Sequence, residues 1–442
     1  MKPVQLEFAN RRQAILAEML PDSVAIVAAA SEQTRSNDTE YPFRQNSDFW
    51  YLSGFNEPDA YLLLVKKDGV EESILFCRAK NKLAEIWNGR RLGPEKAAEQ
   101  LAFDHALPIE EFEEYARKVL NGATTLYWRH GDSELDQKVI ALLKAVRNMG
   151  KLASTPHQLF DFSKIVHEKR LFKTDSEIAI MQKAADISTD AHKRAMKVCQ
   201  PGMYEYQVEA EIKHEFAMQG ARFEAYNSIV AGGDNACILH YTENSELLQD
   251  GDLLLIDAGC EYQGYAADIT RTFPVNGRFS EAQKQIYQLV LDAQTEALKV
   301  LKPGNTLQQA TDVAVDVITL GLIDLGILTG TLADNKNSQN EQPPAYRKYF
   351  MHGLGHWLGL DVHDVGQYKC NGTERVLEPG MALTVEPGIY ISEDADVEDK
   401  WKGIGVRIED NIVITDDGHQ ILTANVPKTI AEIESWMSAN NA

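Results

Sequence analysis

Five side chains in the second half of the chain have the types and the setting to bind metal ions together. They are Asp257, Asp268, His356, Glu386 and Glu409, and each lies in a stretch that otherwise has the composition of buried structure. Four carboxylates brought together repel one another unless their pKa values rise or cations lie among them. Two divalent ions would place four positive charges against these four negative ones. The set therefore predicts a hydrolytic centre with two metal ions.

The two aspartates lie in LLLIDAGCEYQGYAADITRTF. The run Leu253–Ile256 predicts a buried strand, so the carboxylate of Asp257 at its end needs a cation or several hydrogen bonds. Asp268 follows a turn at Gly264 and would face Asp257 across an antiparallel hairpin. On spacing alone, two aspartates that cap turns remain an alternative.

The histidines near these carboxylates outnumber those that the metal ions need. His352 and His356 in HGLGH would share one face of a helix, although the two glycines disfavour a regular helix. Gly353 stands where the zinc-protease pattern HExxH requires Glu. His363 and His240 complete the group, and surplus histidines could stabilise a tetrahedral intermediate and transfer protons. Buried histidines with a purely structural role remain an alternative.

Glu386 and Glu409 interrupt the apolar stretches LTVEPGIY and GVRIEDNIVI, where a carboxylate is out of pattern. Arg407 precedes Glu409 by two residues, so one strand would carry both on the same face. Arg407 could orient Glu409 through a bidentate pair or neutralise charge near the site. An ordinary Arg–Glu pair across two strands is the alternative.

The donor set indicates which metal ions would bind. Oxygen-rich coordination with one imidazole suits Mn²⁺ and leaves Co²⁺, Fe²⁺ or Zn²⁺ as alternatives. No cysteine belongs to the set, which disfavours a structural zinc site. Two ions about 3.5–4 Å apart would hold a hydroxide between them and polarise a scissile carbonyl.

Composition limits the other classes of function. The chain has 442 residues, 44% of them hydrophobic and 25% charged, which is typical of a globular protein of about two to three domains. The net charge of -22 argues against nucleic acid or an anionic membrane as a partner. No apolar run approaches the ~20 residues that span a bilayer, and the N-terminus lacks the apolar core of a signal peptide. Five scattered cysteines favour a reducing cytoplasm over a disulfide framework.

Residues 1–172 are predicted to form a smaller α/β domain, and residues 173–442 a catalytic domain. SVAIVAAA, AYLLLVKK and ESILFCRA predict strands, whereas PEKAAEQLA and LDQKVIALLKAVRNMG predict helices. A long helix would begin after Thr174 or Asp175. The polar stretch LADNKNSQNEQPPAYRKYF predicts a surface loop, whose part 333–344 could line a substrate entrance or merely be long.

The second domain contains an internal repeat. Asp190-Ala191, Ala195 and Pro201-Gly202 recur as Asp292-Ala293, Ala297 and Pro303-Gly304 at one constant spacing. Leu248, Gly251, Leu254, Asp257 and Gly259 match Leu377, Gly380, Leu383, Glu386 and Gly388 at a second spacing. Each half would run helix, Pro-Gly turn, helix and then an apolar strand with a carboxylate. The repeat predicts an α/β (α+β) domain with pseudo-two-fold symmetry and the metal pair at its centre.

Several stretches resemble signature motifs of the metallopeptidases with the pita-bread fold, and most closely those of the aminopeptidase P group. HGLGHWLGLDVHD, LEPGMALTVEPGIY, GVRIEDNIVI and IDAGCEYQGYAADITRTF carry the resemblance in the second half, and EYPFRQNSDFWYLSGFNEPDAYLLL in the first. The resemblance implies release of an N-terminal residue from peptides with proline at the second position. A prolidase, which hydrolyses Xaa-Pro dipeptides with the same ligand set, is the alternative.

The resemblance also implies a role for each residue of the site. Asp268 and Glu409 would bridge two ions, most often manganese, while Asp257 completes one ion's coordination and His356 and Glu386 the other's. His240 and His363 would contact the substrate near proline, His352 would support the tetrahedral intermediate, and Arg407 would support the ligands.

The same resemblance bears on partners. It implies a homodimer or homotetramer, in which Trp87 of EIWNGRRLG would reach a neighbouring subunit's pocket. A packed surface aromatic is an equal alternative for Trp87. Metal-free relatives, which act as binding modules or as creatinase-like hydrolases, are disfavoured because all five ligands are present.

Overall fold

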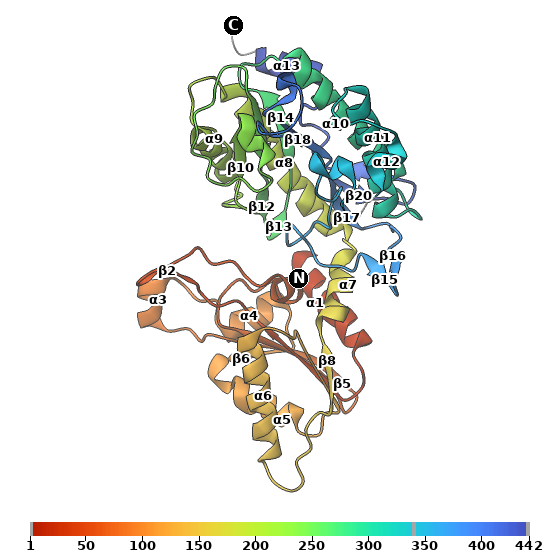
Figure 1. Ribbon diagram of the computed structural model, residues 1–442. Helices are drawn as coiled ribbons and strands as arrows, with labels where there is room; N and C mark the ends of the chain where they lie inside the picture. The colour runs from red at the N-terminus through yellow and green to blue at the C-terminus, as the bar shows by residue number, and fades with distance from the viewer. Residues whose placement is uncertain (1–2, 338–341, 439–442) are drawn as a thin grey trace. The chain divides into compact units, whose positions relative to one another are not determined.

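The computed structural model describes residues 3–337 and 342–438, and the chain divides into two compact units, Met1–Arg170 and Leu171–Ala442. The division falls close to the boundary expected at residue 172. Both units combine helices and strands (Figure 1), as the sequence predicted for an α/β (α+β) chain.

A six-stranded mixed sheet organises the first unit, in the order β6-β5-β4-β1-β7-β8. The neighbours β1, β4 and β5 pair antiparallel, whereas β7, β8 and β6 join in parallel. The sheet strands are β1 Ser23–Ala28, β4 Tyr61–Lys67, β5 Val70–Cys77, β6 His105–Pro108, β7 Thr125–Trp128 and β8 Gln158–Asp161; a separate hairpin holds β2 Thr34–Ser36 and β3 Thr39–Glu40. The three strands predicted from the sequence are confirmed as β1, β4 and β5.

The helices of the first unit follow the expected apolar periodicity. Val139, Leu142 and Val146 of α6 are buried together with strand residues in one core cluster. The two predicted helices are confirmed as α4 and α6. The helices are α1 Pro3–Glu18, α2 Ser47–Ser53, α3 Lys82–Asn88, α4 Pro94–Leu101, η1 Ile109–Glu111, α5 Phe112–Leu120, α6 Ser133–Arg147 and α7 Ser163–Leu171.

The second unit is built from two similar halves. In each, a pair of packed helices precedes an antiparallel pair of strands: α8 and α9 before β11 and β14, then α10 and α11 before β17 and β20. Figure 1 shows α10 and α11 side by side along one edge of the unit. The α-helices are α8 Asp175–Val198, α9 Glu205–Met218, α10 Glu281–Val300, α11 Leu307–Asp324, α12 Leu332–Lys336 and α13 Ile430–Ser438.

Short strands fill the centre of this unit. They are β9 Phe223–Glu224, β10 Ile229–Gly232, β11 Leu253–Asp257, β12 Cys260–Tyr262, β13 Tyr265–Ala266, β14 Thr270–Pro274, β15 Lys369–Cys370, β16 Thr373–Glu374, β17 Ala382–Val385, β18 Gly388–Ile391, β19 Ile404–Arg407, β20 Asp410–Ile414 and β21 His419–Ile421. The 3₁₀ turns are η2 Gly233–Cys237, η3 Ala345–Lys348 and η4 Asp399–Trp401.

Hydrogen bonds at the Pro-Gly turns repeat in both halves. The amide of Gly202 donates to the Leu248 carbonyl at 2.9 Å, and that of Gly304 donates to the Leu377 carbonyl at 3.1 Å. Isolated bridges join Tyr204 to Leu247 and Thr306 to Val376, at the same relative positions. Since these contacts link the spans that the sequence matched, the predicted pseudo-two-fold repeat is confirmed.

Two further predictions concern the ends of elements. Helix α8 begins after Thr174, whose hydroxyl and Glu177 form a capping box, so the first of the two expected N-caps is the one used. The stretch expected to be a surface loop contains α12 and η3, because Thr331 and Asp334 cap a short helix there. Residues 338–341 of the 333–344 segment lie outside the described residues.

In the described part of the chain, no helix combines the length and apolar character that a membrane crossing needs.

Candidate metal centre and active site

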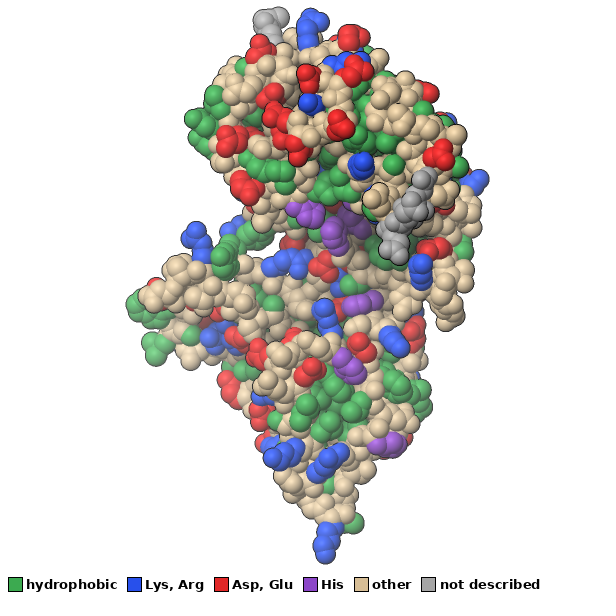
Figure 2. Space-filling view, viewed as in Figure 1, with side chains coloured by type: hydrophobic (Ala, Val, Ile, Leu, Met, Phe, Trp, Pro, Cys, Tyr) green, Lys and Arg blue, Asp and Glu red, His purple; other side chains and the backbone are tan. Residues whose placement is uncertain are grey.

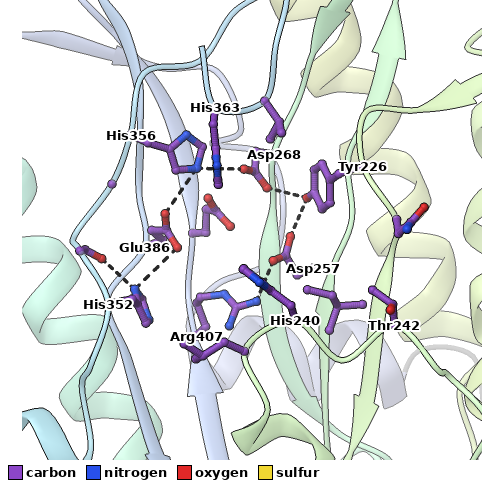
Figure 3. A pocket seen from close by; sticks show the side chains of 17 residues that line it. Tyr226, His240, Thr242, Asp257, Asp268, His352, His356, His363, Glu386 and Arg407 are labelled. Carbon is purple, nitrogen blue, oxygen red and sulfur yellow. Dashed lines mark hydrogen bonds and ion pairs between the residues drawn. The ribbon is translucent and has the colours of Figure 1, made fainter. Parts of the chain in front are cut away.

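A cavity of about 500 Å³ in the second unit collects the chemically interesting side chains (Figure 3). Its walls come from β11, from the turns beside β14, β17 and β20, and from two irregular segments that carry histidines. The predicted site residues that line it are Asp257, Asp268, His356, Glu386, Glu409, His240, His352, His363 and Arg407.

Asp257 and Asp268 meet because β11 and β14 pair antiparallel. Asp257 ends β11 opposite Thr270, the first residue of β14, which Asp268 precedes by two. The hydroxyl of Tyr226 lies between the two carboxylates, 2.6 Å from Asp257 Oδ1 and 2.5 Å from Asp268 Oδ1, and donates its hydrogen to this pair. Sequence reasoning missed Tyr226, since a tyrosine in a polar turn before a strand has no distinctive pattern.

The second half supplies Glu386 directly after β17 and Glu409 between β19 and β20. His356 lies on an irregular segment that binds β17 as a strand would: its amide donates to Thr384 Oγ1 at 3.1 Å, and the Thr384 amide donates to its carbonyl at 2.9 Å. This pairing aims His356 Nε2 at the carboxylates, 3.4 Å from Asp268 Oδ2 and 3.5 Å from Glu386 Oε1. The doubt about a regular helix through HGLGH was justified.

Three of these residues have the spacing of ligands to one ion. Donor atoms of Asp268, His356 and Glu409 all lie within 4.8 Å of one another. Asp268 and Glu409 come from different halves of the repeat, so the symmetry itself brings their carboxylates together. Asp257 joins Asp268 through the Tyr226 hydroxyl, and Glu386 lies next to His356 (Figure 3).

The carboxylates are not balanced by the cations of the chain. Burial raises the pKa of Glu386 to about 8, with Asp268 adding to the rise, and burial together with Asp268 raises the pKa of Glu409 further above its usual value. The pKa of Asp257 is also raised, by burial against the opposing effect of Arg407. Asp268 differs: burial raises its pKa, but hydrogen bonding and charge from His356 bring it below the ordinary value.

The excess of carboxylates over neighbouring cations fits two divalent metal ions. Added positive charge at the centre would bring the raised carboxylate pKa values down and satisfy the oxygens that accept few hydrogen bonds. His356 is the one imidazole among the candidate ligands, and interaction with Asp268 and Glu386 raises its pKa to about 9 despite burial. The donor set is oxygen-rich, as the sequence indicated.

Arg407 connects the two halves, in a way that the sequence did not predict. Its Nη2 donates to Asp257 Oδ2 at 2.7 Å, and its Nε donates to Thr270 Oγ1 at 3.1 Å. Thr270 in turn donates to Glu409 Oε2 at 2.7 Å. Arg407 therefore reaches Glu409 through the hydroxyl of Thr270. The bidentate Arg407–Glu409 pair considered from the sequence is wrong, because the guanidinium of Arg407 binds Asp257 instead.

Asp410 and Asn411, the first residues of β20, are paired with other groups of the chain. Asp410 follows Glu409, but its side chain meets Arg271 Nη2 at 2.7 Å and Lys428 Nζ at 2.6 Å. Although burial opposes it, Arg271 and Lys428 bring the pKa of Asp410 far below its usual range. The side chain of Asn411 then pairs with the backbone of Asp268, accepting from its amide at 2.9 Å and donating to its carbonyl.

The remaining histidines also line the cavity. His352 Nδ1 donates to the Gly353 carbonyl at 2.7 Å and lies 3.9 Å from Glu386 Oε2. His352 Nε2 lies 2.7 Å from the Tyr390 hydroxyl, which also accepts from Arg407 Nη1 at 3.0 Å. Burial, with Arg407 nearby, lowers the pKa of His352 to about 4, so its ring is neutral at neutral pH. His363 packs edge-to-face on His356 at 4.1 Å between ring centroids, and burial lowers its pKa. Tyr390 is a second residue that the sequence did not reveal.

Trp87 has a different setting from the other predicted site residues. It lies on α3 of the first unit, is 86% exposed and is not among the described residues that line the cavity. Figure 2 shows hydrophobic side chains on the surface at this helix, and Leu83 and Ile86 are exposed beside Trp87. The same figure shows a group of histidine side chains at the surface of the second unit.

Comparison with known proteins assigns this arrangement to a class. Residues 179–416 match the model of metallopeptidase family M24, and residues 8–127 match the aminopeptidase P N-terminal domain. The chain thus belongs to metallopeptidase family M24, as the sequence motifs indicated.

Within the family, the chain is similar to the Xaa-Pro aminopeptidase of Escherichia coli strain K12, at 50% identity over 98% of both chains. Its structure is similar to that of proline aminopeptidase P II from Yersinia pestis, with a TM-score of 0.95 and 53% identity over 99% of this chain and 100% of that one. A zinc-substituted aminopeptidase P of Escherichia coli in complex with product also matches, at a TM-score of 0.95 and 50% identity over 99% and 98% of the two chains.

Proposed function

We propose that the chain is an Xaa-Pro aminopeptidase, which releases the N-terminal residue from peptides with proline at the second position. One observation carries the proposal. Four buried carboxylates and one imidazole converge on a cavity of about 500 Å³, in a chain that is half identical, nearly end to end, to an Xaa-Pro aminopeptidase.

The five candidate ligands would hold two divalent metal ions. We assign Asp268 and Glu409 to both ions, Asp257 to one, and His356 and Glu386 to the other. When bound, the ions supply Lewis-acid charge that polarises the scissile carbonyl and activates water. Mn²⁺ is our first choice because the donors are mainly carboxylate oxygens, and Co²⁺, Fe²⁺ or Zn²⁺ would also be accepted.

A neutral imidazole, that of His352, lies in the same cavity as the candidate ligands. The low pKa of His352 keeps its imidazole neutral, so it can lie beside the tetrahedral intermediate without adding a second cation; its Nδ1–H donates to the Gly353 carbonyl and its Nε2 accepts from the Tyr390 hydroxyl. Tyr390 fixes the orientation of His352, and Arg407 holds both Tyr390 and Asp257 in place. We therefore propose His352 as a catalytic residue and Arg407 as a positioning residue.

His240 and His363 would bind the substrate near proline. An Xaa-Pro bond is a tertiary amide without an N–H, so recognition depends on contacts with carbonyl oxygens and with the ring. His363 packs edge-to-face against His356, one of the candidate ligands. His240, His352 and His363 all line the same cavity (Figure 3).

We further propose that the protein is a cytoplasmic homodimer or homotetramer with peptide substrates. Leu83, Ile86 and Trp87 leave the apolar face of α3 exposed, which is unusual for a helix of a monomer and fits contact with a second copy. In such an assembly Trp87 would contact a neighbouring subunit. Nucleic acid and membranes are not expected as partners of a chain with a net charge of -22.

A comparison of three peptides tests the proposal. Metal-free protein is assayed with Gly-Pro, Gly-Pro-Leu and Gly-Ala-Leu, each with and without added Mn²⁺. Metal-dependent release of glycine from Gly-Pro-Leu, with little cleavage of Gly-Ala-Leu, is the expected result. Cleavage of Gly-Pro alone would replace the proposal with a prolidase, and no cleavage of any peptide would reject a peptidase role.

A further inference from the structure

The segment that carries His240 has little regular structure of its own. After β10 the chain forms the short turn η2 and then runs to β11 without forming a strand. Within this segment, Leu239, His240 and Thr242 line the cavity. A segment without ladder hydrogen bonds keeps its side chains in place only if other groups satisfy its backbone.

Glu205, the first residue of α9, supplies that support from the far side of the segment. Its Oε1 accepts from the Gly232 amide at 2.8 Å and from Asn235 Nδ2 at 3.1 Å. Its Oε2 accepts from the Tyr241 hydroxyl at 2.8 Å and from the Glu246 amide at 2.9 Å. The Glu205 side chain is fully buried. One carboxylate thus ties together both ends and the middle of the 232–246 segment.

The contacts of Glu205 bracket the residues that line the cavity. Tyr241 follows His240 directly and is buried in a small cluster with residues of β10 and β11, so its ring and hydroxyl are both fixed. Asn244 adds a second tether, because its side chain accepts from the Val230 amide and donates to the Ser228 carbonyl, each at 2.9 Å. The strand β10 that these bonds reach pairs with β11, which ends in Asp257.

The internal repeat provides a comparison within the same chain. Glu205 begins α9 after the Pro201-Gly202 turn, and the residue in the matching place after Pro303-Gly304 is Leu307, which packs against the hydrophobic core. The helix start therefore does not require a buried carboxylate. The first half of the repeat has a buried carboxylate at this helix start, and the segment that follows its helix carries His240.

We propose that Glu205 is a positioning residue for the substrate-binding side of the active site. By holding the 232–246 segment, it sets where His240 and Thr242 meet the peptide, while the metal ligands are held by other contacts. This inference rests on the proposed Xaa-Pro aminopeptidase function.

The variant Glu205→Gln isolates this role, because glutamine keeps the size and replaces one acceptor oxygen with a donor. In one orientation its NH₂ group faces the Gly232 amide, and in the other it faces the Glu246 amide. Either way one backbone N–H loses its acceptor. Glutamine therefore loosens the segment without opening a cavity.

The test measures kcat, KM and metal content of the full-length protein with Gly-Pro-Leu. For Glu205→Gln we expect KM to rise about tenfold, kcat to stay within about twofold and bound metal to be unchanged. Amide hydrogen exchange is expected to accelerate across the 232–246 segment. An unchanged KM, or a loss of metal together with kcat, would overturn the inference.

Two further variants make the outcome interpretable. Tyr241→Phe removes one of the four hydrogen bonds and keeps the buried ring, so it should raise KM by a smaller factor and remains informative if Glu205→Gln fails to fold. Glu211→Gln on the same helix, which pairs with Arg194 at the surface, is the matched control and should leave KM unchanged. Absence of cleavage by the unaltered protein would reject the proposed function instead, and an unchanged hydrogen-exchange rate in Glu205→Gln would then reject the role of Glu205 independently.

Discussion

Buried carboxylates occur in both units of the molecule, and their surroundings differ. In the first unit, Asp48 of α2 meets Arg170 Nη1 at 2.6 Å and His167 Nε2 at 3.1 Å. These partners outweigh the effect of burial and lower the pKa of Asp48 to about 2. In the second unit, Glu386 and Glu409 face other carboxylates, and burial raises both pKa values.

The difference separates a carboxylate that stabilises the fold from the carboxylates that we propose as metal ligands. A buried charge is tolerated when the chain supplies its counter-charge, as Arg170 does for Asp48. At the cavity the chain supplies Arg407 and the imidazole of His356 for four carboxylates, and the pKa values of three of these, Asp257, Glu386 and Glu409, are raised. Asp410 shows that the second unit is able to provide such partners, since Arg271 and Lys428 neutralise it one residue after Glu409.

The largest expected effect comes from replacing one of the carboxylates that we assign to the metal ions. Glu409→Gln keeps the shape of the side chain but removes one of the charges that would hold the ions. We expect kcat/KM for Gly-Pro-Leu to fall at least about 10⁴-fold, with loss of bound metal measured by mass spectrometry. The metal-free variant should be as stable as the metal-free unaltered protein, because the lost charge was not neutralised by the chain. Substantial activity with full metal content would contradict the ligand assignment.

Replacing Asp48, whose charge is neutralised by Arg170, should lower stability and leave activity unchanged. Asp48→Asn leaves the buried Arg170 without its counter-charge, and we expect the free energy of unfolding of the first unit to fall by about 3–5 kcal/mol. Bound metal and kcat of the folded enzyme should stay unchanged. Urea denaturation, followed by hydrogen exchange in the strands β1 and β4, measures the effect. A loss of kcat without a loss of stability would contradict the distinction between the two sets.

Adding metal should sharpen the comparison in the second unit alone. Ions that bind only the folded state stabilise it by about 3 kcal/mol at a concentration about 100 times Kd. We expect Mn²⁺ to raise the thermal midpoint of the unaltered protein and to leave that of Glu409→Gln almost unchanged. Asp48→Asn should respond to Mn²⁺ as the unaltered protein does. An equal rise in Glu409→Gln would show that the ions bind elsewhere.

Sequence patterns predicted the elements and the candidate ligands because both depend on local properties. Alternating apolar runs predicted β1, β4 and β5, and the recurrence of Pro-Gly and Leu-Gly patterns predicted the two halves. Asp257 and Glu386 stood out because each ends an apolar run, where an unpaired charge is costly.

The contacts that arrange the site depend on residues far apart in the chain, which no local pattern reveals. Arg407 donates to Asp257, 150 residues away in the sequence, and reaches its neighbour Glu409 through the hydroxyl of Thr270. Tyr226 and Tyr390 reach the centre only once the strands are paired. Glu205 is the first residue of α9, and only the folded path of the 232–246 segment shows which groups its carboxylate binds.

The smallest expected effect is the pH dependence of the Asp48 contribution. The pKa of Asp48 is about 2 in the folded protein, below the ordinary value of 3.8, so the ionised form stabilises the fold. That stabilisation is fully present above about pH 4 and is lost as the pH falls through about 2; its size is about 2 kcal/mol. The difference in unfolding free energy between the unaltered protein and Asp48→Asn should therefore shrink by this amount between pH 5 and pH 2. A constant difference across that range would mean that Arg170 and His167 do not lower the pKa, and Asp48 would then no longer contrast with Glu386.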